Sequence, residues 1–131
     1  MSNNKKWSSD YPTHLVIPPL NSIEINKVLF RFVINREPDH SDFLPSFKDP
    51  SQRHLGRRAN FRNNPRFYGT SFFNTESKMK SLQEESPEKF SEKRIAKGAI
   101  LPKHGKGEIG KSEHVSMWFY EGVYPEGFKV I

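Results

Sequence analysis

The stretch that most constrains the fold is Arg66–Phe73, which reads Arg-Phe-Tyr-Gly-Thr-Ser-Phe-Phe. Two aromatic pairs flank a small step with hydroxyl side chains, and aromatic residues favour strands. Gly69 inside the run indicates a bulge, or the close approach of another group to the backbone. Asn74 or Thr75 can then cap a helix over Glu76–Glu85. The stretch predicts a strand that joins an arginine-rich segment to a helix.

Other runs rich in β-branched and aromatic residues also predict strands. These are Lys27–Ile34, Arg94–Leu101, His114–Tyr120 and Phe128–Ile131. Ser86-Pro87 predicts a further helical turn, whereas the glycines and lysines of Lys103–Ser112 predict a flexible loop.

The chain is long enough for one hydrophobic core. It has 131 residues, with 11 Phe, 4 Tyr and 2 Trp, so we expect a modest, aromatic core. The order of elements predicts an α+β fold with a mixed or antiparallel sheet and one or two helices. We expect a single domain over residues 14–131, preceded by a polar, flexible tail over residues 1–13.

Between the first two strong strands, Asn35–Asn64 has no sustained period and predicts a long Arg-rich loop, although Ser51–Arg62 could also form a helix. The net charge of the whole chain is +6. Much of the excess lies in a span without an acidic residue, which favours a polyanion or a phosphate-bearing ligand. The residues predicted for a nucleic-acid patch are Arg53, Arg57, Arg58, Arg62, Arg66 and His114. A solvated arginine-rich loop explains the same residues equally well.

Composition excludes several classes of site. There is no cysteine, hence no disulfide, thiolate metal site or cysteine nucleophile. The five histidines are scattered singly, so we expect no metal site. No apolar run approaches the ~18 residues of a membrane span, and the first residues are polar. We therefore expect a cytoplasmic protein without a membrane partner.

Two short motifs have chemical meaning. Gly105–Ser112 matches the G-x-x-x-x-G-K-[ST] pattern of phosphate-binding loops, but a β-rich segment follows it instead of the required helix, so we expect an ordinary loop. In a strand, His114 and Ser116 would share one face. They could perform acid–base chemistry on a phosphodiester, or His114 could be a partly buried side chain beside Trp118.

The order of these features resembles the RES-domain toxins and, more broadly, the ADP-ribosyltransferase-like folds that bind NAD. Arg31 resembles the arginine of their first strand. Gly56–Asn60 resembles a Gly-Arg element, and Tyr68–Ser71 resembles a Tyr-Thr-Ser strand. The similarity covers roughly Leu29–Glu85, under half of the chain. The tryptophan of the Gly-Arg element is missing, and one residue is inserted there.

The resemblance implies an NAD-consuming or ADP-ribosylating enzyme of toxin or effector type, with NAD as its substrate and a protein target or cognate inhibitor as its partner. Glu84 or Glu85 would stand for the helix glutamate, Glu121 or Glu113 could replace it, and Ser116 would stand for a late serine. The implied catalytic residues are Arg31, Tyr68, Glu84, Glu85, Glu121 and Ser116. The implied NAD-binding residues are Arg31, Arg57, Arg58, Tyr68, Thr70 and Ser71.

Two other functions fit the same residues. The arginine patch would suit an RNA-directed toxin or an RNA-binding protein. Exposed aromatic side chains and the long loop would suit a non-enzymatic interaction or inhibitor module. The sequence leaves open whether the protein is an enzyme.

Overall fold

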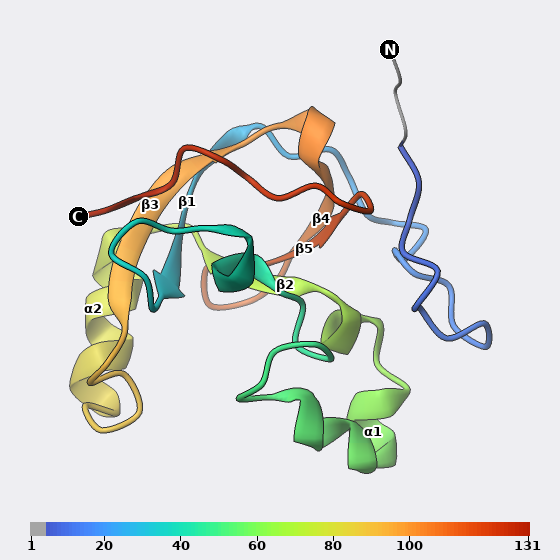
Figure 1. The fold of residues 1–131 in the computed structure, drawn as a ribbon, viewed down its shortest axis with the longest axis horizontal. Coiled ribbons are helices and arrows are strands. Elements are labelled where there is room, and N and C mark those ends of the chain that lie inside the picture. The colour runs from blue at the N-terminus through green and yellow to red at the C-terminus, as the bar shows by residue number, and fades with distance from the viewer. Residues whose placement is uncertain (1–4) are drawn as a thin grey trace.

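The fold is built on one curved, antiparallel sheet. The structure is a computed structural model that describes residues 5–131. Across the sheet the strands run in the order β4-β5-β2-β1-β3-β6, and Figure 1 labels the first five strands of the chain, β1 to β5. Their bounds are β1 Lys27–Val33, β2 Thr70–Phe73, β3 Arg94–Ile100, β4 Gly105–Ile109, β5 His114–Phe119 and β6 Lys129–Val130. The expected single α+β domain is confirmed, and its sheet is antiparallel.

The two halves of the sheet meet at β2. Strand β1 pairs with β3 along its whole length: Lys27 lies opposite Ile100 at one end, and Val33 lies opposite Arg94 at the other. Strand β2 likewise pairs with β5 along its whole length, but its register with β1 is confined to Phe30 and Phe73. Beyond that pair β1 and β2 separate, and the sheet opens between them.

Helix α2, Glu76–Glu85, has the predicted bounds. Thr75 is its N-cap: the Thr75 side chain accepts a hydrogen bond of 3.1 Å from the Lys78 backbone N–H. Met79 is fully buried against the sheet, where α2 contacts β1 and β2. The sequence signals for a helix start were therefore sufficient here.

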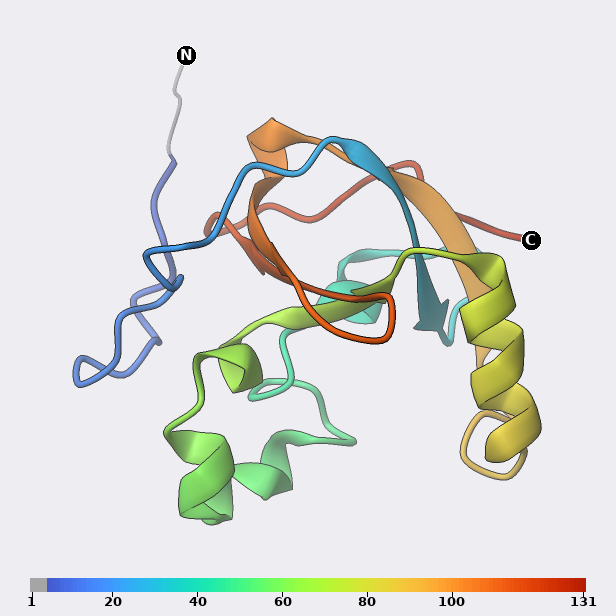
Figure 2. The ribbon, with the colours of Figure 1, turned by 180° about the vertical axis from the view of Figure 1, so that it is seen from behind.

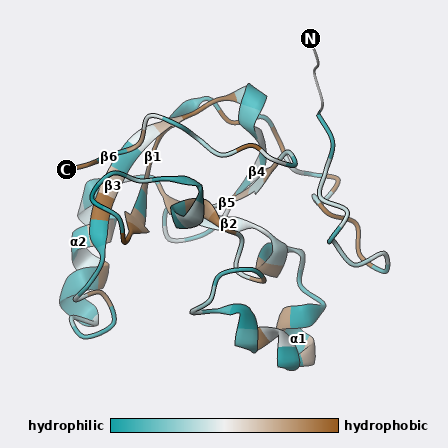
Figure 3. Cartoon of the chain, in the orientation of Figure 1, coloured by the Kyte–Doolittle hydropathy of each residue, from teal (hydrophilic) through white to brown (hydrophobic). Residues whose placement is uncertain are grey.

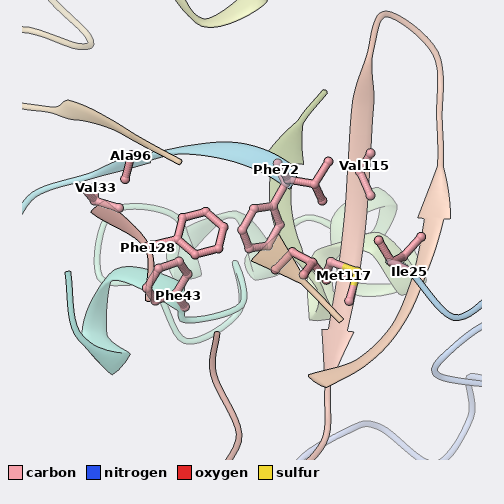
Figure 4. Close-up of a cluster of buried hydrophobic side chains, with 10 residues drawn as sticks. Ile25, Val33, Phe43, Phe72, Ala96, Val115, Met117 and Phe128 are labelled. Atoms are coloured by element: carbon pink, nitrogen blue, oxygen red, sulfur yellow. The ribbon is translucent and has the colours of Figure 1, made fainter. Parts of the chain in front are cut away.

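The core lies on the inner face of the curved sheet. Phe72 of β2 is fully buried there, and the rings of Phe43 and Phe128 lie against it from two connecting segments (Figure 4). The Phe43 and Phe128 ring centroids are 5.1 Å apart, in an edge-to-face arrangement that aromatic pairs favour. Phe43 belongs to the short 3₁₀ helix η1, His40–Phe43, which lies across this face.

The start of the second predicted strand differs from the structure. The strand predicted over Arg66–Phe73 begins only at Thr70, because Pro65–Tyr68 forms the 3₁₀ helix η3. Asn64 caps η3 by accepting a hydrogen bond from the Arg66 N–H, and proline at the first helical position has no N–H to lose. The single turn predicted after Ser86 is present, since the Phe90 N–H donates a hydrogen bond of 3.3 Å to the Ser86 carbonyl, and it does not extend into a longer helix.

The predicted long loop is also more structured than expected. It contains η1, the 3₁₀ helix η2 (Arg53–Arg57) and the short helix α1 (Ala59–Arg62). Seen from both sides, the short helices after residue 52 project from the sheet (Figures 1 and 2). The ribbon of these short helices is coloured largely as hydrophilic, with hydrophobic stretches at α1 (Figure 3).

The prediction of a flexible loop over Lys103–Ser112 is also wrong. It contains the 3₁₀ helix η4, Pro102–His104, and strand β4, which pairs with β5. Glycine is required at position 107, since a Cβ there would lie 2.6 Å from the Met117 Sδ atom. Gly107 therefore allows the β4 backbone to approach the core closely. Most of the segment that matches the phosphate-loop pattern, Gly105–Ile109, forms strand β4, so the match is coincidental.

Candidate functional site

A pocket of about 400 Å³ lies on the inner face of the sheet. All four tyrosines of the chain line this pocket, which we call the tyrosine pocket. They are Tyr11, Tyr68, Tyr120 and Tyr124. The aromatic lining is completed by Phe43, Phe47 and Phe119. Pockets of this size with mostly aromatic walls and a few polar groups are typical of small-molecule sites.

Each tyrosine is held by a specific contact. The Tyr68 hydroxyl donates a hydrogen bond of 2.8 Å to the Arg62 carbonyl. Tyr11 meets the Tyr68 ring edge-on, with ring centroids 6.3 Å apart. Tyr120 packs against Trp7 at 4.5 Å, and Tyr124 stacks on Phe43 at 6.0 Å. Trp7 and Tyr11 belong to the segment predicted to be a flexible tail. Tyr11 lines the pocket, and Trp7 packs against Tyr120, another lining residue.

Burial changes the acidity of two of these phenols. Desolvation raises the pKa of Tyr11 to about 12. It also raises the pKa of Tyr68, against an opposing effect of the nearby Arg62 cation. Burial thus favours the neutral form of both phenols, and the Tyr68 hydroxyl uses its proton to donate to the Arg62 carbonyl.

Polar groups stand at the edge of the tyrosine pocket. Glu121 follows β5, and Gly122 after it has a positive φ of 76°, which turns the chain sharply. The Glu121 side chain is exposed, and it makes no ion pair within residues 5–131. Lys48 lies over the Phe47 ring and pairs with Asp10 at 2.6 Å. The edge of the pocket thus presents the Glu121 carboxylate and the Lys48–Asp10 ion pair beside aromatic walls.

Arg31 lies in a different pocket, of about 570 Å³, together with Ser71, Lys89 and Lys93. Its Nε donates to the Asp42 carbonyl and its Nη1 to the Ser71 carbonyl, each at 2.7 Å. Burial lowers the pKa of Arg31 to about 10, although Asp49 and Asp42 act to raise it. Arg31 therefore serves first to join backbone segments.

The segment around Phe43 separates the two pockets. Leu44 lines both of them, whereas Asp42 lines the Arg31 pocket and Phe43 the tyrosine pocket. Thr70 lines the tyrosine pocket, where its hydroxyl donates to the Phe43 carbonyl at 3.0 Å, and its neighbour Ser71 lines the other. The structure thus places Tyr68, Thr70 and Glu121 together, and Arg31 with Ser71 apart from them.

The remaining predicted residues lie outside both pockets. Glu84 and Glu85 are exposed on α2, and Arg57 and Arg58 are exposed on the projecting helices. Glu113 accepts a hydrogen bond of 3.1 Å from the Thr75 hydroxyl.

Ser116 and His114 lie on the outer face of the sheet. Ser116 is buried and stands opposite Ser71 in the β2–β5 register. The His114 ring packs edge-on against Phe73 at 5.2 Å. Burial and the charge of Arg66 lower the pKa of His114, whereas Glu108 raises it. His114 is therefore a partly buried side chain next to an ion pair, that of Arg66 and Glu108 at 2.7 Å.

Sequence reasoning missed most of the tyrosine pocket. Tyr120 and Tyr124 flank a turn at the end of β5, while Tyr11 lies more than fifty residues before Tyr68 in sequence. No spacing pattern connects them, because long-range packing brings them together. The available signal was chemical: tyrosine is scarce in this chain, and its polar hydroxyl makes it typical of partly hydrated binding sites.

Comparisons with family models, with curated proteins and with solved structures found no match. Within residues 5–131 there is no cluster of three or more His, Asp or Glu side chains that could hold a metal ion. In the same part of the chain, no helix has the length and apolar character needed to cross a membrane.

Proposed function

We propose that the tyrosine pocket binds NAD, and that the protein breaks the bond between nicotinamide and ribose as a glycohydrolase or an ADP-ribosyltransferase. The observation that supports this most is the meeting of Tyr68, Thr70 and Glu121 in one aromatic pocket. These are three of the residues that the resemblance to NAD-binding toxins singles out. Tyr68 and Thr70 are close in sequence, whereas Glu121 comes from the segment after β5, so the fold is what brings Glu121 to them.

The pocket suits the ring of NAD. Nicotinamide in NAD is a cation, and cationic ligands bind favourably against the faces of tyrosine rings. Its amide would find hydrogen-bond partners among the tyrosine hydroxyls. Lys48 at the edge pairs with Asp10, and the pyrophosphate would replace Asp10 as its partner, since lysine binds phosphate as a point charge. Each of these groups lines the pocket or its edge.

The chemistry requires one carboxylate near the ribose. When the C1′–N bond breaks, nicotinamide leaves with the bonding electron pair as a neutral ring, and positive charge develops at C1′ and the ring oxygen. The negative Glu121 side chain stabilises that oxocarbenium-like state. Water, or a nucleophile on a target, then adds at C1′ and loses a proton. Hydrolysis thus yields nicotinamide, ADP-ribose and one proton.

Arg31 has a supporting role in this proposal. Two of its guanidinium nitrogens already donate to backbone carbonyls, and it lines the other pocket. Replacing Arg31 should therefore affect NAD cleavage through the stability of the fold. This differs from the role that the family resemblance implies for the first-strand arginine.

The test is to incubate the protein with NAD and to quantify nicotinamide and ADP-ribose by mass spectrometry, with labelled NAD and a cell extract to detect transfer to a target. Glu121→Gln should retain NAD binding by calorimetry and lose at least ~100-fold in rate, the loss typical of removing one electrostatic stabiliser. The Glu84→Gln and Glu85→Gln variants are matched controls that should cleave at the wild-type rate.

Three results would contradict the proposal or a part of it. NAD that stays intact with wild-type protein, with no labelled target, would overturn the function. Full activity of Glu121→Gln would remove the assignment of Glu121. Loss of activity in the α2 variants alone would move the carboxylate role to Glu84 or Glu85.

A further inference from the structure

The projecting segment of residues 53–66 forms a distinct surface, which we call the arginine arm. It consists of η2, α1 and the first part of η3, and it stands away from the sheet in both views (Figures 1 and 2). All five of its arginines are exposed: Arg53, Arg57, Arg58, Arg62 and Arg66. The sequence between Pro50 and Thr75 has no acidic residue. The arm therefore carries a concentrated positive charge.

Little of this charge is neutralised by the protein. Arg66 pairs with Glu108 at 2.7 Å. Arg62 donates to the Gly56 and Arg57 carbonyls at 3.1 Å, which leaves its charge uncompensated. Within residues 5–131 the side chains of Arg53, Arg57 and Arg58 make no hydrogen bond or ion pair. Four positive charges thus remain available on the arm.

The packing of the arm does not involve the side chains of Arg53, Arg57 and Arg58. Its own packing rests on Phe61 and Phe67, whose ring centroids are 6.1 Å apart, and on the Tyr68 hydroxyl bond to the Arg62 carbonyl. A Cβ added at Gly56 would lie 3.1 Å from the Phe67 ring, so this backbone approaches the same cluster closely. Because these contacts hold the arm together without Arg53, Arg57 and Arg58, these three arginines indicate an external anion.

We infer that the arginine arm binds single-stranded nucleic acid through its phosphates. Repeated, exposed cations without acidic neighbours match a polyphosphate backbone. Helix α1 has four residues, too short to enter and read a major groove as a recognition helix does. Phe61 is half-buried in the arm, and surfaces that bind single strands combine cations with aromatic groups.

An anionic membrane is a poorer partner for the arm. Interfacial membrane binding combines cations with apolar side chains that enter the lipid. The large exposed apolar residues of the described chain are Val16, Leu20, Ile23, Val28, Ile34, Ile109 and Ile131, none of them in the arm. The arm therefore has the charge for a polyanion but no apolar anchor for a bilayer. This inference is independent of NAD cleavage.

The test is fluorescence anisotropy with a labelled single-stranded RNA of about 20 nucleotides, long enough to span a typical single-strand site. Four phosphate contacts predict a slope of about −3 in a plot of log affinity against log salt. Affinity should then fall about 50-fold between roughly 50 and 200 mM salt. A DNA strand of the same sequence shows whether the 2′-hydroxyl contributes.

The deciding variant is Arg53→Gln/Arg57→Gln/Arg58→Gln, which should weaken binding and reduce the slope to about −0.7, that of one remaining contact. Its charge-matched control is Arg36→Gln/Arg94→Gln/Lys97→Gln, which removes three exposed cations elsewhere and should keep the wild-type slope. If the triple arm variant fails to fold, the single variant Arg57→Gln should still lower the slope by about 0.7.

Four outcomes would overturn the inference. These are absence of RNA binding at low salt, an arm variant that binds as wild type, and an equal loss in the control. The fourth is stronger binding to a duplex of the same sequence, or to phosphatidylserine vesicles, than to the single strand. A loss of RNA binding that is confined to the arm variant supports the inference, whether or not the protein cleaves NAD.

Discussion

The Arg31 guanidinium donates a 2.7 Å hydrogen bond to the Ser71 carbonyl at the point where β1 and β2 separate. The last paired residues of the two strands are Phe30 and Phe73. Beyond this pair, the Arg31 side chain instead of a backbone N–H donates to the Ser71 carbonyl of β2. A second bond from Arg31 to the Asp42 carbonyl ties η1 to the same junction. One arginine thus holds three backbone segments where the sheet opens.

Arg31→Met should lower the free energy of unfolding by about 2–4 kcal/mol, because two partly buried carbonyls lose charged donors. Urea unfolding followed by circular dichroism measures this change. Arg94→Met on β3 is the control, since Arg94 is exposed and makes no ion pair within residues 5–131. Equal stability of the two variants would show that the Arg31 bonds contribute little.

Gly98→Ala should destabilise the fold by about 1–3 kcal/mol through overpacking. A Cβ at position 98 would meet the Phe128 ring, with the ring Cγ atom at 2.7 Å, and Phe128 belongs to the buried core. Gly110→Ala is the matched control, because its nearest neighbour would be 3.5 Å away. Thermal unfolding of both variants checks the prediction, and a Gly98→Ala protein as stable as Gly110→Ala would contradict it.

Local sequence signals predicted the elements that local physics determines. The helix start at Thr75 and the apolar strand after Lys27 needed no tertiary information. Strand β4 was missed because its sequence is rich in glycine and lysine, and only its pairing with β5 makes it a strand. Tertiary context overrode weak local preference there.

The candidate site was predictable only in part, for a different reason. Tyr68, Thr70 and Glu121 were chosen from the sequence by resemblance, and they line one pocket. Arg31 was chosen in the same way and lies in another. Which of the two pockets a residue lines depends on where the segment around Phe43 crosses the sheet. No local pattern in the sequence specifies that crossing.

Stability should decrease as the pH falls below about 6.5, in part because of His104. This buried ring accepts a hydrogen bond of 2.9 Å from the Leu101 N–H through Nδ1. Burial and then Lys103 lower the pKa of His104, while Glu126 raises it. The unfolded chain therefore binds the proton more readily, so the stabilisation is present above the unfolded pKa and is lost in acid.

The measurement for His104 is urea unfolding at a series of pH values between about 4 and 8, a range that brackets the histidine pKa. His104→Asn removes the titrating group, and its stability should vary less with pH than that of the wild type. The partly buried His114 titrates in the same direction, so His114→Asn is the companion variant. An unchanged pH dependence in His104→Asn would contradict the assignment.

Tyr11 should make the protein sensitive to alkali. Burial raises its pKa from 10.0 to about 12, so the folded state favours the neutral phenol. The stabilisation is complete below pH 10 and is lost as the pH rises through about 12, by roughly 2 kcal/mol at most. Tyr11→Phe should flatten the fall in stability over this range, as measured by urea unfolding, and the ultraviolet absorbance of tyrosinate should show one late-titrating phenol fewer. A Tyr11→Phe protein with the alkaline stability profile of the wild type would show that the Tyr11 hydroxyl is hydrated, and that this wall of the pocket is open to water.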